Sequence, residues 1–351
     1  MKSLLRLLLK SQHQRNRSGP AQTDKGMSLV ELLVGSIMAF LIITPMIGFV
    51  VDMLNTDRRE QVKSNTEQDI QAAVDFIAQD LSQAIYIYDN NTLNKPASDG
   101  TDGISSQLPA PPGGTPILVF WKRQQIKNAV SVDQDRRLRV LPNQCDNDPN
   151  NCNDTYVRSL VAYYQIKDSD PIWCQPSSTT CPTRIARYEI REGVRNPDSV
   201  DPEKPYYDQS QAKEGQLASE AFDPDFDFSK PRLKVTKGSG FPSHEVLVNY
   251  IDHSSSNVPT PTGDQCQALL GVTPPTGSAA AEFDSSDLLI TDQSTNSFYA
   301  CVDTARNLAR VTIRGNSLRR LEAKNSDYDA KKAAYFPTAT VQVQGLGGLG
   351  K

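Results

Sequence analysis

The feature that most constrains this chain is a stretch of twenty uncharged residues that begins at Leu32 and ends at Val51. A helix rises about 1.5 Å per residue, so this stretch spans about 30 Å, the thickness of the hydrocarbon core of a bilayer. The apolar region of a secretory signal peptide is much shorter. The stretch therefore predicts a transmembrane helix, with a buried helix of a soluble domain as the alternative.

The charges on the two sides of this stretch predict its orientation. The first 26 residues carry six Lys or Arg and one Asp, whereas the rest of the chain carries 31 basic and 40 acidic side chains. By the positive-inside rule the basic segment faces the cytoplasm. We expect a single-pass protein of the bacterial inner membrane with its larger part in the periplasm. An acidic body repels polyanions, so we expect no nucleic-acid partner.

Two segments with different patterns follow the predicted span. Residues 52–89 lack Pro and Gly and carry apolar residues at helical spacing, namely Ile70, Val74, Ile77, Leu81, Ile85 and Tyr88. This spacing predicts an amphipathic helix that continues the membrane helix and packs on a domain. Residues 90–116 are rich in Asn, Asp, Gly and Pro and predict a linker loop.

The remaining residues, 117–351, predict a β-rich periplasmic head domain. Six runs rich in β-branched and aromatic residues predict strands, at 117–121, 157–166, 185–190, 245–251, 308–313 and 338–343. Long polar insertions at 195–232 and 254–297 separate some of them and predict irregular loops. Because the helix precedes the strands, we expect an α+β fold in which a long N-terminal helix packs on an antiparallel sheet.

All six cysteines follow the predicted span: Cys145, Cys152, Cys174, Cys181, Cys266 and Cys301. An even number confined to the periplasmic part predicts disulfides. Zinc is the alternative, but zinc ligands usually come in pairs two to four residues apart, and the first four cysteines are spaced more widely. Fifteen pairings are possible; closure of short loops favours pairing the first with the second and the third with the fourth, which leaves the last two.

The junction of the basic segment and the span reads Lys25-Gly26-Met27-Ser28, with Glu31 five positions after the glycine. Glycine leaves room for a protease to reach an extended backbone. The pattern resembles the class III signal of type IV prepilins and pseudopilins, in which prepilin peptidase cuts after the glycine and methylates the new amino terminus. The resemblance implies that residues 1–26 are a cleaved leader and that Met27 becomes the N-methylated first residue.

Two residues of the apolar helix are candidate assembly residues. Glu31 is a carboxylate at the mouth of an apolar helix, where an unpaired charge is costly and usually functional. Its candidate partner is the amino terminus of Met27 on a neighbouring subunit; the alternative is a carboxylate that only complements the helix dipole. Pro45 removes a backbone hydrogen bond and predicts a kink or a loosened turn. The resemblance implies a segment that unwinds on fibre assembly, and a proline tolerated within a bundle is the alternative.

Patterns that imitate catalytic or metal sites are weak. Asp252-His253-Ser254 contains the three residue types of a Ser-His-Asp catalytic triad. Adjacent residues at a strand end point to different sides, however, so we interpret this segment as a surface turn. The acidic stretches 146–150 and 223–227 lack the Gly and the terminal Glu of a calcium loop and are interpreted as solvated turns, with calcium as the alternative. We therefore expect no enzymatic activity, no metal and no cofactor.

The large head resembles those of minor pseudopilins of the W/J type. Residues 43–61 and 79–89 resemble the C-type pseudopilins of hormogonium polysaccharide secretion. This resemblance implies a minor pseudopilin, a subunit of a pseudopilus that drives polysaccharide secretion for surface gliding motility. The implied partners are prepilin peptidase, other pilins or pseudopilins through the N-terminal helix, the inner-membrane assembly platform and, as a further candidate, the exported polysaccharide.

Two alternatives remain open from the sequence. The first is a minor type IV pilin that acts in pilus priming, adhesion or DNA uptake. The second is a membrane-anchored periplasmic enzyme or sugar-binding protein.

Overall fold

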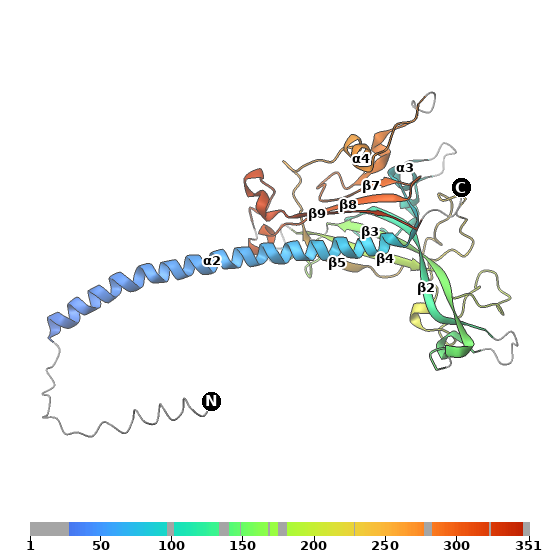
Figure 1. The fold of residues 1–351 in the computed structure, drawn as a ribbon, viewed down its shortest axis with the longest axis horizontal. Helices are drawn as coiled ribbons and strands as arrows, with labels where there is room; N and C mark the ends of the chain where they lie inside the picture. The colour runs from blue at the N-terminus through green and yellow to red at the C-terminus, as the bar shows by residue number, and fades with distance from the viewer. Residues whose placement is uncertain are drawn as a thin grey trace, which may run out of the picture. The chain divides into compact units, whose positions relative to one another are not determined.

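The computed structural model describes residues 28–96, 102–132, 140–147, 149–167, 169–174, 181–227, 229–276, 283–322 and 324–346 (Figure 1). The chain forms two compact units, Met1–Arg58 and Arg59–Lys351. Helix α2, Leu29–Ser82, runs without interruption through the boundary between them.

Helix α2 confirms the long N-terminal helix but ends earlier than expected. The prediction that the helix reaches residue 89 is wrong, because strand β1, Ala84–Ile87, begins two residues after Ser82. Ile85 and its aromatic neighbours favour a strand once β2 offers a pairing partner, and pairing with Phe120 and Trp121 overrides the helical spacing.

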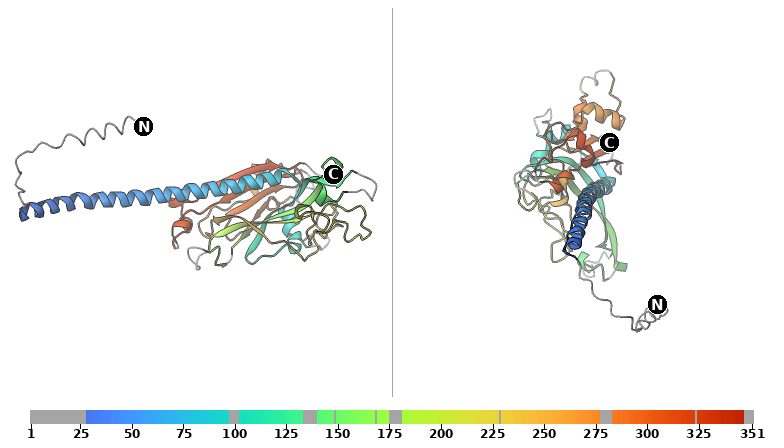
Figure 2. Two further views of the ribbon diagram at one scale, coloured as in Figure 1. Left: turned by 90° about the horizontal axis from the view of Figure 1, so that it is seen from below. Right: turned by 90° about the vertical axis from the view of Figure 1, so that its left-hand side faces the viewer.

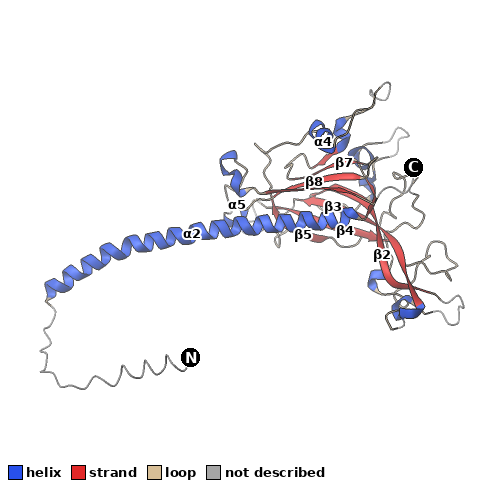
Figure 3. Cartoon of the chain, viewed as in Figure 1, coloured by secondary structure: helices blue, strands red, loops and turns tan. Residues whose placement is uncertain are grey.

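The first sheet is antiparallel and has the order β1-β2-β3-β4-β5. Figure 3 labels four of its strands, β2 to β5. Its further strands are β2 (Gly114–Ser131), β3 (Cys152–Ile166), β4 (Thr183–Arg191) and β5 (Glu245–Ile251). The hairpin β2–β3 pairs from Gly114 opposite Ile166 to Ser131 opposite Cys152. The four predicted strands of this sheet exist, and β2 and β3 are longer than their apolar runs because their outer halves are solvent-exposed on one face.

The second sheet is also antiparallel, with the order β6-β7-β8-β9. Its strands are β6 (Leu289–Thr291), β7 (Phe298–Asp303), β8 (Leu308–Arg314) and β9 (Thr338–Gln344). The expectation of a single sheet is therefore wrong. The insertion at 254–297 is not wholly irregular, because it contains α4 (Gly263–Leu270) and β6.

Residues 90–116 are not a simple linker. They contain helix α3, Asn90–Asn94, and the first residues of β2, and Leu93, Ile104 and Leu108 are buried in the main core. The remaining short helices are α5 (Leu318–Leu321) and the 3-10 turns Ile104–Gln107, Pro142–Gln144, Pro149–Asn151, Glu214–Gln216, Ser285–Leu288 and Ala330–Tyr335.

One hydrophobic core joins the second half of α2 to both sheets. The buried face of the helix carries Ile70, Ala73, Val74, Ile77 and Leu81, and these contact a cluster to which strands of both sheets contribute. Figures 1 and 2 show this part of α2 lying along the strands. The amphipathic spacing predicted for Ile70 to Leu81 is therefore confirmed as core packing.

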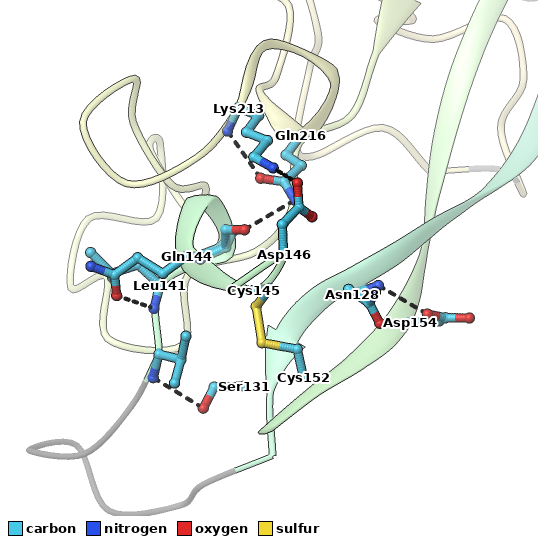
Figure 4. The surroundings of a disulfide bond; sticks show 12 residues. Asn128, Ser131, Leu141, Gln144, Cys145, Asp146, Cys152, Asp154, Lys213 and Gln216 are labelled. Carbon is cyan, nitrogen blue, oxygen red and sulfur yellow. Dashed lines mark hydrogen bonds and ion pairs between the residues drawn. A yellow bond between two sulfur atoms is a disulfide. The ribbon is translucent and has the colours of Figure 1, made fainter. Parts of the chain in front are cut away.

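The six cysteines form three disulfides, Cys145–Cys152, Cys174–Cys181 and Cys266–Cys301. This is the pairing that short-loop closure favours, and no cysteine is left for zinc. The first bond closes the turn that leads into β3 (Figure 4). Beside it, an ion pair between Lys213 and Asp146 joins that turn to a distant loop.

Candidate functional site

The N-terminal helix is the candidate site, and its first turn is capped by the serine of the motif. Ser28 Oγ accepts a hydrogen bond from the Val30 amide at 3.3 Å, and its carbonyl accepts one from the Leu32 amide at 3.0 Å. Glu31 lies in this turn, where the free amides and the helix dipole stabilise a negative charge. Gly26 and Met27 lie outside the described residues.

The first half of α2 is apolar and exposed. Every side chain from Leu29 to Leu54 is exposed in the isolated chain, although most are large and hydrophobic. Within the described residues this is the one helix long and apolar enough to cross a membrane. It contains the whole segment from Leu32 to Val51, so a single-pass membrane protein is consistent with the structure.

Pro45 lies inside this segment, and the helix continues through it. Its missing amide leaves the Leu41 carbonyl without its usual partner. One residue earlier, Thr44 Oγ1 donates to the Phe40 carbonyl at 2.8 Å, which adds a second polar contact to the same turn. The helix is therefore continuous at Pro45, and the kink or loosened turn expected there stays a prediction.

The second half of α2 is anchored to the first sheet by a buried ionic cluster. Asp80 projects from the apolar face of the helix and receives three donors: Lys122 Nζ at 3.0 Å, the Tyr163 hydroxyl at 2.7 Å and Arg187 Nε at 2.8 Å. Glu189 closes the cluster with contacts to Arg187 Nη2 at 2.8 Å and Lys122 Nζ at 3.4 Å. The helix is thereby joined to β2, β3 and β4 at once.

Two carboxylates and two cations form the centre of this anchor cluster, and each of the four side chains is less than 13% exposed. A third cation, the partly exposed Arg191, has its Nη2 3.5 Å from Glu189 Oε2. Burial by itself would raise the pKa of Glu189, but the positive charges of Lys122, Arg187 and Arg191 outweigh it and lower that pKa to about 2. Burial, and then the nearby Asp80 carboxylate, raise the pKa of Tyr163 well above its usual value. Tyr163 therefore stays protonated and donates to Asp80.

The sequence interpretation did not identify the anchor cluster. A signal was present, because Asp80 interrupts the apolar face between Ile77 and Leu81, and Lys122 directly follows the buried run of β2. A charge on an apolar helix face needs a partner in the core.

A second buried polar cluster surrounds Asp252, so the surface turn expected at Asp252-His253-Ser254 is wrong. Asp252 accepts from Arg314 Nε at 2.8 Å and from Ser254 Oγ at 2.6 Å. Burial lowers the pKa of His253, and its Nε2 lies 3.5 Å from Asp327 Oδ1. Ser254 donates to the aspartate and not to the histidine, so the three residues do not form a nucleophilic triad.

The acidic stretches do not gather metal ligands in the described part of the chain. No group of three or more His, Cys, Asp or Glu residues there could hold a metal ion. Asp223 is buried, contrary to the expected solvated turn, and accepts from the amide of Asp225 at 3.1 Å while Lys234 Nζ lies 3.4 Å away. Asp148 lies outside the described residues.

Comparison with family models, curated proteins and solved structures gives no match to this chain.

Proposed function

We propose that this chain is a minor pseudopilin, a structural subunit of a pseudopilus that drives polysaccharide secretion for surface gliding. The observation that carries the proposal is the continuous helix α2. From Leu29 to Val51 the helix is exposed, and Glu31 is its one charged residue in that range. Its second half packs into the core of a disulfide-bonded α+β head. The prepilin-like motif at Gly26 directly precedes this helix.

The two halves of α2 suit the two stages of this role. Before assembly, the segment from Leu32 to Val51 spans the inner membrane, with the leader in the cytoplasm and the head in the periplasm. After cleavage, the same apolar surface packs against the helices of neighbouring subunits in the fibre. The anchor cluster around Asp80 holds the helix to the head while the fibre is extended.

In this proposal Glu31 sets the axial register between the helices of neighbouring subunits. In an apolar fibre core its carboxylate needs a cation, and the N-methylated amine of Met27 on the next subunit is the cation that cleavage creates. Cleavage and assembly are thereby coupled, because the uncut chain has a peptide bond at that position and no charge to offer.

The mature amino terminus tests the class of protein. Mass spectrometry of the chain from its native host should find an N-methylated Met27, and it should find the uncut chain when prepilin peptidase is deleted or Gly26→Val is introduced. Gly35→Val is the matched control, because a Cβ there meets nothing within 4 Å in the isolated chain, and it should be cut normally. If the wild-type chain in the membrane fraction is uncut and still begins at Met1, the proposal is wrong.

The role of Glu31 is tested separately from cleavage. Glu31→Gln should be cut and methylated normally but should be lost from the sheared fibre fraction. Glu60→Gln, which changes an exposed glutamate of the same helix, should assemble as wild type. Normal incorporation of Glu31→Gln would show that the carboxylate only complements the helix dipole.

Deletion of the gene tests whether the chain serves polysaccharide secretion or a type IV pilus. A pseudopilin of polysaccharide secretion predicts loss of secreted polysaccharide and of gliding with surface pili unchanged in number. Loss of pili, of adhesion or of DNA uptake with normal secretion would instead indicate a minor type IV pilin.

A further inference from the structure

A cavity of about 350 Å³ opens on the face of the second sheet that is turned away from the core. Its floor consists of Tyr299 from β7, Thr312 and Arg314 from β8, and Thr338 from β9. Alternate residues of these strands fill the core, so the floor side chains point outward. The volume falls in the range of about 300–1,000 Å³ that small-molecule sites occupy.

One wall of the cavity is fixed covalently to the floor. The residues Pro259, Pro261 and Gln265 line this wall, and α4 begins within it. The disulfide Cys266–Cys301 ties α4 to β7 directly beside the floor. A wall held in this way keeps the cavity open without a ligand, which lowers the cost of binding.

Two further aromatic residues also line the cavity. Tyr328 and Phe336 meet edge to face, with ring centroids 5.0 Å apart. The Arg314 guanidinium lies 5.5 Å from the centre of the Tyr328 ring. The two rings are inclined by 66° and Phe336 is only 4% exposed, so the Tyr328 ring supplies most of the accessible aromatic surface of the cavity.

Arg314 supplies an oriented donor at the floor. Its Nε donates to Asp252 at 2.8 Å and its Nη2 to the Thr295 carbonyl at 3.1 Å. Its side chain is 7% exposed, and no hydrogen bond within the described residues engages its Nη1. Asp252 neutralises the charge, so the floor presents an N–H donor without a net positive charge.

We propose that this cavity binds one neutral sugar unit of a saccharide chain. A pyranose ring has an apolar C–H face, which fits against the Tyr328 ring. It also has a rim of hydroxyls, which fits the Arg314 donor and the threonine hydroxyls. A phosphate or carboxylate would need an unpaired cation, and the one charged residue of the lining is already paired. The site goes beyond fibre assembly and does not depend on cleavage at Gly26.

Binding is tested with the full-length chain in a zwitterionic detergent, because glycoside detergents would compete. The probes are neutral hexasaccharides of glucose, galactose, mannose and xylose, measured by titration calorimetry and saturation-transfer NMR. At least one should bind, and Tyr328→Ala should weaken it about tenfold or more. Tyr156→Ala removes an exposed tyrosine of β3 far from the lining and should bind as wild type.

A second variant keeps the test valid if Tyr328→Ala does not fold. Ala333 is an exposed residue at the rim, and Ala333→Trp should fill the cavity and abolish binding while the melting temperature is retained. The proposal would be overturned if none of the four saccharides binds at millimolar concentration. It would also be overturned if both variants bind a saccharide as tightly as the wild-type chain does. Tighter binding of inorganic phosphate or of a proline-rich peptide would assign the cavity to a different ligand. These outcomes are independent of the amino-terminal analysis, so this inference and the proposed function can fail separately.

Discussion

Removal of the Asp80 carboxylate should loosen the helix from the head more than any other single charge change on α2. Asp80→Asn keeps the shape of the side chain but leaves Lys122 and Arg187 to share the one remaining carboxylate, Glu189, with Arg191. It also turns an amide N–H toward a cation. Truncating one partner of a buried ion pair costs roughly 3–5 kcal/mol, since the remaining charge stays buried and uncompensated. For the unit Arg59–Lys351, with an unfolding entropy of about 2.1 cal/mol/K per residue, that lowers the melting temperature by about 5–8 °C.

The assay is thermal unfolding of the full chain in detergent, followed by near-ultraviolet circular dichroism. This signal reports on the head core, where Trp121 Nε1 donates to the Tyr88 hydroxyl at 3.0 Å. Asp75→Asn is the matched control, because Asp75 is an exposed residue of the same helix whose carboxylate accepts only from Gln71 within the described residues. It should change stability by less than about 0.5 kcal/mol.

A double variant separates charge imbalance from loss of packing. Asp80→Asn with Lys122→Gln removes one of the two cations that lose their contact with Asp80, so Glu189 then faces only Arg187 and Arg191. The loss of unfolding free energy should therefore be smaller than the sum of the two single losses by more than about 1 kcal/mol. A stability of Asp80→Asn within 0.5 kcal/mol of wild type, or strict additivity in the double variant, would refute the view that the anchor cluster holds the helix.

Three further predictions concern the head. The pKa of Glu189 in the folded chain is about 2, against a usual 4.5, so its ionised form stabilises the fold by up to about 3 kcal/mol. This stabilisation is present above pH about 4.5 and is lost as the pH falls toward 2. Glu189→Gln should therefore reduce the pH dependence of stability between pH 2 and 4.5, and an unchanged profile would contradict the assignment. Gly345→Ala places a methyl group 2.3 Å from a backbone carbonyl of β1 and should cost about 1–3 kcal/mol in urea unfolding, whereas Gly215→Ala, where a Cβ meets nothing within 4 Å, should cost less. Replacing both Cys266 and Cys301 by Ser opens a loop with a sequence separation of 35 and should lower stability by about 4 kcal/mol; equal melting temperatures with and without the bond would argue against this estimate.

The sequence predicted the elements whose patterns are local. Glu245–Ile251 appears as β5 with the expected bounds, and β8 and β9 each extend one residue beyond their apolar runs. Strand β7, Phe298–Asp303, was not predicted: it begins directly after the insertion expected at 254–297, and the sequence patterns assign no element to it. Its assignment depends on pairing with β8 from Phe298 to Asp303, which is a contact that local spacing does not reveal.

The sequence alone determined the membrane-length apolar segment, the helix that continues it and the favoured cysteine pairing, because each depends on residues close together in the chain. Only the tertiary structure decided that Asp80 meets partners from three strands, that Asp252 is buried against Arg314, and that an aromatic cavity lies on the second sheet. Those features join residues as much as 107 positions apart, as Asp80 and Arg187 are. A hydrophobic pattern predicts which face is buried, but it does not specify which distant polar groups will share that buried face.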